Sequence, residues 1–136
     1  MKTYNLFISH SWAYSNAYDG LVNLLDARKY FSYRNSSVPK DDPLHTIGTD
    51  KALYAAIKKK VSSCSVVLIL AGVYGSYSKW IDKEIQIAQT EFSVSKPIIA
   101  IKPRGSQRTS TKVTEAADKI VGWNTESIVS AIRELA

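Results

Sequence analysis

Along the chain, short apolar runs typical of strands alternate with segments in which apolar residues recur at helical spacing. Two runs are apolar at nearly every position, "SVVLILAG" (65–72) and "KPIIAIKP" (96–103), which predicts strands buried on both faces of a sheet. Shorter apolar or β-prone runs predict strands over Tyr4–Ser9, one ending near Arg34, and one near Ile120 and Val121. Between them, apolar residues at helical spacing predict helices over 14–29, 49–64 and 76–89, a short piece from 115, and a last helix over 124–136.

Strands therefore alternate with helices through residues 1–136, which indicates a single domain. This pattern predicts an α/β fold, a doubly wound sheet of five mainly parallel strands with helices on both faces. The second strand resembles an edge strand, which favours the order 2-1-3-4-5.

The predicted helix over "SYSKWIDKEIQIAQ" (76–89) has one residue out of pattern. Glu84 falls on its apolar arc, one turn after Trp80 and one turn before Ala88. A carboxylate in that position must be partnered, neutralised or open to a pocket. Ligands of doubly wound sheets bind outside the carboxyl ends of the strands, near the point where the strand order reverses. The helix begins at that edge, so we expect Glu84 to open into a crevice there.

Composition and charge narrow the setting. A single cysteine, Cys64, excludes an internal disulfide framework, and no apolar run reaches the length that spans a bilayer. The first residues lack the pattern of a signal peptide, so we expect a cytoplasmic protein without a membrane partner. The net charge of +6 and the pI of about 9.4 suit an anionic ligand, and nucleic acid is the least supported choice. The lysines at 58–60 are typical of a solvated helix face.

Several common occupants of such sheets are excluded by missing motifs. A phosphoacceptor domain needs acidic residues where this chain has Ser9 and Gly72, and a dinucleotide site needs a glycine-rich turn after the first strand. Neither a P-loop nor a nucleophile elbow is present. His10, His45 and Cys64 are too few to favour a metal site.

Together, "FISHSW" (7–12), "SCSVVLILAGVY" (63–74), the S-x-W-x-x-x-E element ending at Glu84, and "ADKIVGWN" (117–124) resemble the TIR-like domains of bacterial antiphage defence. The closest resemblance is to the ThsB-type branch of the Thoeris system. It implies a flavodoxin-like sheet and cleavage of NAD⁺ at the nicotinamide–ribose bond. The implied product is a cyclic or conjugated ADP-ribose signal that activates a separate effector protein.

The resemblance also implies roles for individual residues, with NAD⁺ as substrate and with neither cofactor nor metal. Glu84 is the expected catalytic residue, because a fixed carboxylate near the ribose stabilises the oxocarbenium-like charge that develops as nicotinamide leaves. Trp80 can form a flat wall beside a ring. The other expected substrate-binding residues line the crevice or contact ribose and phosphate oxygens: Phe7, Ser9, His10, Trp12, Asn35 and Ser76.

The sequence also leaves open a structural role for these residues and, with it, a function other than catalysis. Glu84 and Trp80 can be structural residues at the edge of the core, Glu84 paired with a lysine. The chain would then be a non-catalytic TIR-like module that assembles with itself, as a homo-oligomer, or with another protein.

Overall fold

A computed structural model of the chain describes five segments of it. They are residues 3–9, 17–35, 50–71, 78–102 and 111–136. Of the predicted site residues, His10, Trp12 and Ser76 lie outside these segments.

The described segments form a sheet of five strands, all parallel, in the order β2-β1-β3-β4-β5. The strands are β1 (Thr3–Ile8), β2 (Ser32–Asn35), β3 (Val66–Leu70), β4 (Ile98–Ile101) and β5 (Lys119–Val121). The predicted sheet and its strand order are therefore confirmed, and β3 and β4, the two apolar runs, are interior strands.

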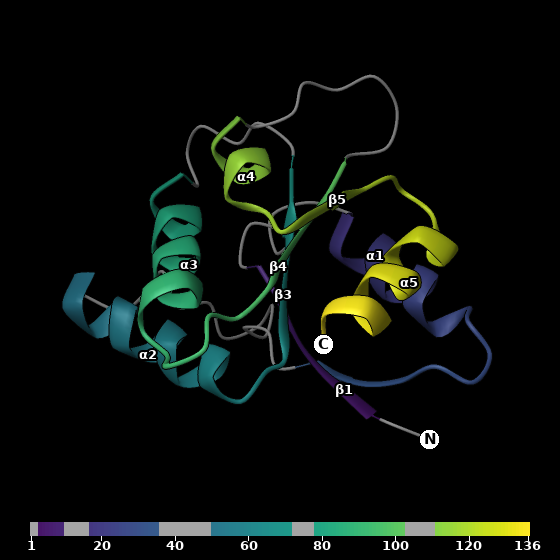
Figure 1. Ribbon diagram of the computed structural model, residues 1–136, viewed down its shortest axis with the longest axis horizontal. Coiled ribbons are helices and arrows are strands. Elements are labelled where there is room, and N and C mark those ends of the chain that lie inside the picture. Colours follow the sequence, from purple (N-terminus) through teal and green to yellow (C-terminus); the bar gives the residue numbers. More distant parts are fainter. Residues whose placement is uncertain (1–2, 10–16, 36–49, 72–77, 103–110) are drawn as a thin grey trace.

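Helices cover both faces of this sheet (Figure 1). They are α1 (Ala17–Asp26), α2 (Asp50–Ser62), α3 (Ser78–Thr90), α4 (Thr111–Ala116) and α5 (Thr125–Leu135). Helices α1 and α5 lie on one face, and α2, α3 and α4 lie on the other. The chain moves from β1 to β2 in one direction and then crosses back to β3, and right-handed crossovers in opposite directions place their helices on opposite faces.

Alternate side chains of the strands build two separate cores. The α5-side core consists of Leu6, Ile8, Leu21, Leu25, Val66, Leu68, Ile99, Ile101, Val121, Ile128, Val129, Ala131 and Ile132. The α3-side core consists of Phe7, Ile57, Val61, Cys64, Val67, Ile69, Ala71, Ile81, Ile85, Ile87, Ala88, Ile98, Ala100 and Val113. A strand that supplies both cores must be apolar at consecutive positions, which is why β3 and β4 are continuous apolar runs.

The ends of the helices differ little from the sequence pattern. Asn124, where the predicted last helix begins, is the N-cap of α5, because its side-chain oxygen accepts a hydrogen bond from the backbone N–H of Ser127 at 2.8 Å. Helix α4 begins at Thr111, inside a segment that the sequence predicts as loop. None of the helices in the described segments is long and apolar enough to cross a membrane.

Candidate active site

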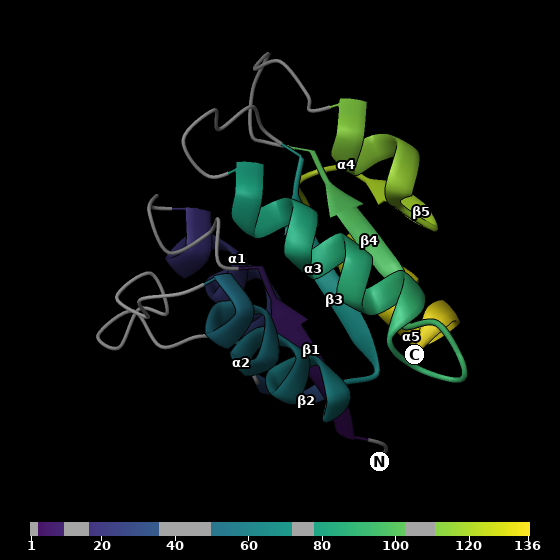
Figure 2. The same cartoon turned by 90° about the vertical axis from the view of Figure 1, so that its left-hand side faces the viewer.

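The candidate site lies at the carboxyl edge of the sheet, where β1 and β3 are neighbours. The backbone N–H of Ser9 donates to the carbonyl of Leu68 at 2.8 Å, so the pairing of β1 with β3 continues one residue beyond β1. Side chains alternate along a strand, and Phe7 belongs to the α3-side core. The side chain of Ser9 is therefore directed toward the same face, where α3 lies (Figure 2).

Helix α3 is amphipathic in the way that the sequence predicts. Ile81, Ile85 and Ala88 are buried in the α3-side core, and Gln86 on the other arc is exposed. Glu84 belongs to the buried arc, and none of its surface is accessible to solvent. Its polar atoms thus need hydrogen-bond partners within the protein.

The Ser9 hydroxyl is one such partner. Its Oγ donates a hydrogen bond to Oε2 of Glu84 at 2.5 Å, and both side chains are buried, with 1% of Ser9 and 0% of Glu84 exposed. Hydrogen bonds from a hydroxyl to an ionised carboxylate are short and about twice as strong as those between neutral groups. The two residues are 75 positions apart in sequence, so the fold itself brings them together.

The expectation that Glu84 opens into a crevice is wrong for this conformation of the chain. The carboxylate is at the expected edge of the sheet but is closed off from solvent. The physical reason is the fold: Ser9, the residue after β1, directs its hydroxyl toward the face on which α3 lies, so the carboxylate has a partner inside the protein. The catalytic role expected for Glu84 stays a prediction.

The other predicted site residues in the described segments do not gather around Glu84 in the way that Ser9 does. Phe7 is fully buried in the α3-side core and so supports the site from within instead of lining an open surface. Asn35 pairs in register with Leu6, which belongs to the α5-side core, so its side chain starts from the face opposite to Ser9. Trp80 lies in α3, one turn before Glu84, but its side chain is outside the described part of the structure.

Sequence reasoning named both Ser9 and Glu84 but missed the contact between them. It treated Ser9 as a residue lining the crevice. The sequence held only part of the signal: alternation places residues 7 and 9 on one face of β1, but that this face is the one covered by α3 is known from the structure.

Cys64 is buried in the α3-side core, as expected for a small residue at a helix end. Burial raises the pKa of its thiol from 9.0 to about 11, and the thiol donates to the carbonyl of Val61 at 3.0 Å. It comes before β3, at the edge of the sheet opposite to Ser9. A protonated thiol at that edge takes no part in the candidate site.

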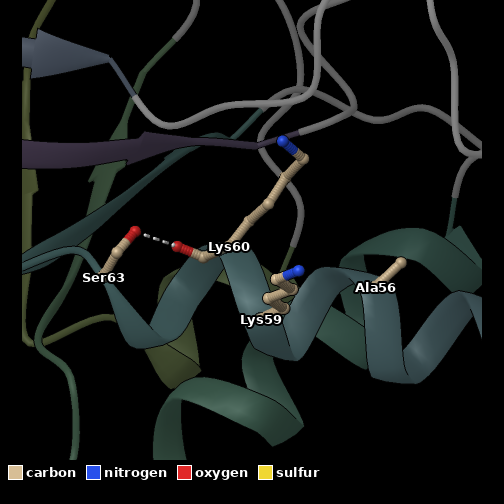
Figure 3. Close-up of a pocket in the computed structure, with 4 residues that line it drawn as sticks. All are labelled: Ala56, Lys59, Lys60 and Ser63. Atoms are coloured by element: carbon tan, nitrogen blue, oxygen red, sulfur yellow. Dashed lines mark hydrogen bonds between the residues drawn. The ribbon is translucent and has the colours of Figure 1, made fainter.

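A pocket of about 550 Å³ lies along one face of α2 (Figure 3). It is lined by Ala56, Lys59, Lys60 and Ser63, which follow one another at helical spacing. The Ser63 hydroxyl donates to the carbonyl of Lys60 at 2.9 Å, and the two lysines stand in the last turn, where positive charge complements the helix dipole. These features suit the solvated helix face that the sequence predicts, and none of Phe7, Ser9, Asn35 and Glu84, the predicted site residues whose side chains are described, is among the residues that line it.

A comparison with known families matches residues 7–108 to the family described as Thoeris protein ThsB, TIR-like domain. This range is 102 of the 136 residues, and it includes Ser9, Glu84 and the strands β2, β3 and β4. No curated protein matches the chain.

Proposed function

This chain belongs to the family of TIR-like domains of Thoeris protein ThsB, and we propose that it cleaves the nicotinamide–ribose bond of NAD⁺. In this proposal the released ADP-ribose portion becomes a cyclic or conjugated signal, which activates a separate effector protein in antiphage defence. The observation that carries the proposal is Glu84, a carboxylate on the apolar face of α3, beside the strand ends where ligands of such sheets bind.

One carboxylate is enough for the chemistry. Nicotinamide is attached to the ribose as a cationic pyridinium and leaves as a neutral molecule, so the leaving group needs no proton. Ordinary glycoside hydrolysis, by contrast, uses a second carboxyl group as an acid. The remaining requirement is to stabilise the positive charge that develops on the ribose. A negatively charged Glu84, surrounded by low-dielectric core, is suited to that task.

The burial of Glu84 adds a condition to the proposal. Because the carboxylate has no accessible surface, NAD⁺ must displace whatever covers it before the ribose can come within reach. In this proposal the energy of binding the rest of the nucleotide drives that rearrangement. We therefore expect NAD⁺ turnover to depend on a conformational step.

The same burial favours a second candidate function. A fully buried carboxylate with a hydroxyl partner is compatible with a structural role, and the chain would then act as a non-catalytic TIR-like interaction module. In that case the charge of Glu84 would matter for folding alone and would have no effect on NAD⁺.

The experiment that separates the two compares cells expressing the chain with cells expressing Glu84→Gln, with and without phage infection. Nicotinamide, NAD⁺ and ADP-ribose products are measured by mass spectrometry. Glutamine keeps the size and the acceptor oxygen but removes the charge. We expect the wild type to release nicotinamide and to form the product, and Glu84→Gln to do neither while keeping its thermal unfolding temperature.

Glu115→Gln is the matched control, because Glu115 is an exposed carboxylate on α4 and its neutralisation changes the total charge equally. It should leave the products unchanged. Products at wild-type levels in Glu84→Gln would contradict the enzymatic proposal. Phage protection that survives in that variant without any product would establish the interaction module instead.

A further inference from the structure

We propose that Ser9 is a positioning residue for Glu84: its hydroxyl orients the carboxylate and keeps it ionised, and it does not bind substrate itself. This inference rests on the proposed cleavage of NAD⁺ and assigns Ser9 a different task from the substrate contact that the sequence suggests. It is carried by the 2.5 Å hydrogen bond from Ser9 Oγ to Glu84 Oε2 and by the complete burial of both side chains.

The donor is held rigidly by the sheet. Ile8 pairs with Leu68, and the N–H of Ser9 donates to the carbonyl of the same Leu68 at 2.8 Å. The Cα of Ser9 is thus fixed as if it were still part of β1. A hydroxyl on such a fixed backbone defines one point in space for Oε2, which restricts the rotation of a side chain that otherwise has three rotatable bonds.

The donor also acts on the acceptor electrostatically. The neighbours of Glu84 on the buried arc of α3, such as Ile81, Ile85 and Ala88, are apolar. A hydrogen bond donated to the ionised form favours that form, so the hydroxyl helps to keep the group negative inside the core. A neutral Glu84 could not stabilise positive charge on the ribose, so the hydroxyl contributes both to the direction and to the ionisation of the group.

This role differs measurably from substrate binding. A residue that contacts NAD⁺ equally in the ground state and the transition state changes KM and leaves kcat alone. A residue that aligns and ionises the catalytic group lowers kcat with little change in KM. Loss of the hydroxyl also makes the carboxylate harder to ionise. The pKa of the carboxyl group then rises relative to the wild type, and the acidic limb of the kcat–pH profile moves to higher pH.

The test uses the full chain, with nicotinamide release from NAD⁺ measured over a range of NAD⁺ concentrations and from pH 5 to pH 8. Ser9→Ala should lower kcat by about tenfold to a hundredfold, the range that corresponds to one hydrogen bond to a charged group. Its KM should stay within about twofold of the wild type, and its acidic limb should move to higher pH. Ser9→Cys keeps the size of the side chain and a weak donor, so its kcat should fall between the two.

Ser95→Ala is the control, because it removes a serine hydroxyl that donates to the Gln89 carbonyl at 3.1 Å on the exposed surface. It should leave kcat and the pH profile unchanged. If Ser9→Ala does not fold, Ser9→Cys and Ser9→Thr provide the kcat and the pH profile. Thr keeps a hydroxyl in the same position and should restore the wild-type pH profile.

The outcomes separate this inference from the function on which it rests. A wild-type chain that releases no nicotinamide, in infected cells and in isolation, overturns the proposed function. If the wild type is active and Glu84→Gln is inactive, a Ser9→Ala variant with raised KM, normal kcat and an unshifted pH profile overturns the positioning role alone. A lower kcat with an unshifted pH profile in every Ser9 variant also overturns it.

Discussion

The two faces of the sheet are built from the same strands but differ in what they bury. On the α1 and α5 face, every buried side chain in the described segments is apolar. On the α2 to α4 face, Ser9 and Glu84 are buried beside an apolar core of similar size. Along β1 this difference appears between consecutive residues, because Ile8 belongs to the first face and Ser9 is directed toward the second.

Burying an ionisable group lowers stability unless its partners compensate, and apolar residues of similar size often do as well or better. A sheet selected only for stability would have two faces like the α5 side. The α3 side therefore contains a feature that stability alone does not explain. This asymmetry supports a functional reason for Glu84, which the following variants are designed to test.

The largest effect is expected from truncating the apolar face. Ile132 on α5 is fully buried, so Ile132→Ala removes buried methylene groups and leaves a cavity. The free energy of unfolding should fall by about 2–5 kcal/mol, measured by urea denaturation. Ser130→Ala is the control on the exposed side of the same helix, and it should change the free energy of unfolding by less than about 0.5 kcal/mol. A loss below about 1 kcal/mol for Ile132→Ala would show that this face is not a tightly packed core.

The second prediction converts the α3 side into an apolar face. Ser9→Ala alone leaves a buried carboxylate without its hydroxyl donor, and the free energy of unfolding should fall by about 1–3 kcal/mol. The double variant Ser9→Ala with Glu84→Met removes both polar groups and keeps a side chain of similar length. It should be as stable as the wild type or more stable, by up to about 4 kcal/mol, while nicotinamide release is lost.

Thermal and urea unfolding of the wild type, Ser9→Ala, Glu84→Met and the double variant complete a thermodynamic cycle. A double variant less stable than Ser9→Ala would mean that the polar pair is required for the fold. The two faces would then differ in how they achieve stability, with no need for a functional reason.

The arrangement of the elements was predictable because each one has a strong local signal. β3 and β4 are continuous apolar runs between helical patterns, and this alternation leaves few topologies for a parallel sheet. The buried arc of α3, including Glu84, was also visible in the spacing of its apolar residues. The start of α4 was missed, because a six-residue helix in a Ser/Thr-rich segment has too few apolar positions to show a period.

The site was predicted only in part, for a different reason. Position 84 was identified because a charge on an apolar arc is a local anomaly. Its partner Ser9 lies 75 residues away, and the pairing depends on how α3 packs on the face toward which Ser9 is directed, which the local pattern of either segment does not determine. Similarly, Asn35 ends the neighbouring strand, yet the register of β2 with β1 directs it toward the opposite face. Whether a polar side chain at a strand end is open or covered depends on such long-range geometry.

The third prediction concerns the thiol of the α3-side core. The pKa of Cys64 is raised from 9.0 to about 11, so above pH 9 the unfolded chain loses the thiol proton and the folded chain keeps it. The unfolded state then binds fewer protons, and stability must fall as the pH rises from 9 to 11. The stability advantage of the wild type over Cys64→Ala should be constant up to about pH 8 and shrink by about 2 kcal/mol near pH 10.5. A constant advantage across this range in urea denaturation would contradict the raised pKa.

The smallest effects are expected where the two faces are alike, at ion pairs on the surface. Arg28 and Glu126 pair at 2.7 Å on the α1 and α5 side, and Lys58 pairs with Glu91 at 3.3 Å on the α2 and α3 side. These side chains are partly exposed, so solvent screens their attraction, and each pair should contribute less than about 1 kcal/mol. Double-variant cycles with Arg28→Gln and Glu126→Gln, and with Lys58→Gln and Glu91→Gln, measure the two contributions by urea denaturation, and 0.5 M NaCl should reduce both.

Equal and small coupling energies on the two sides would confine the difference between the faces to their interiors. A coupling above about 2 kcal/mol for Lys58 and Glu91 would show that the α3 side relies on surface charge to hold its helices. That result would weaken the argument from asymmetry, because the stability of the α3 side would then have a source outside its core, and the buried Glu84 would no longer need to be explained against an otherwise equivalent face.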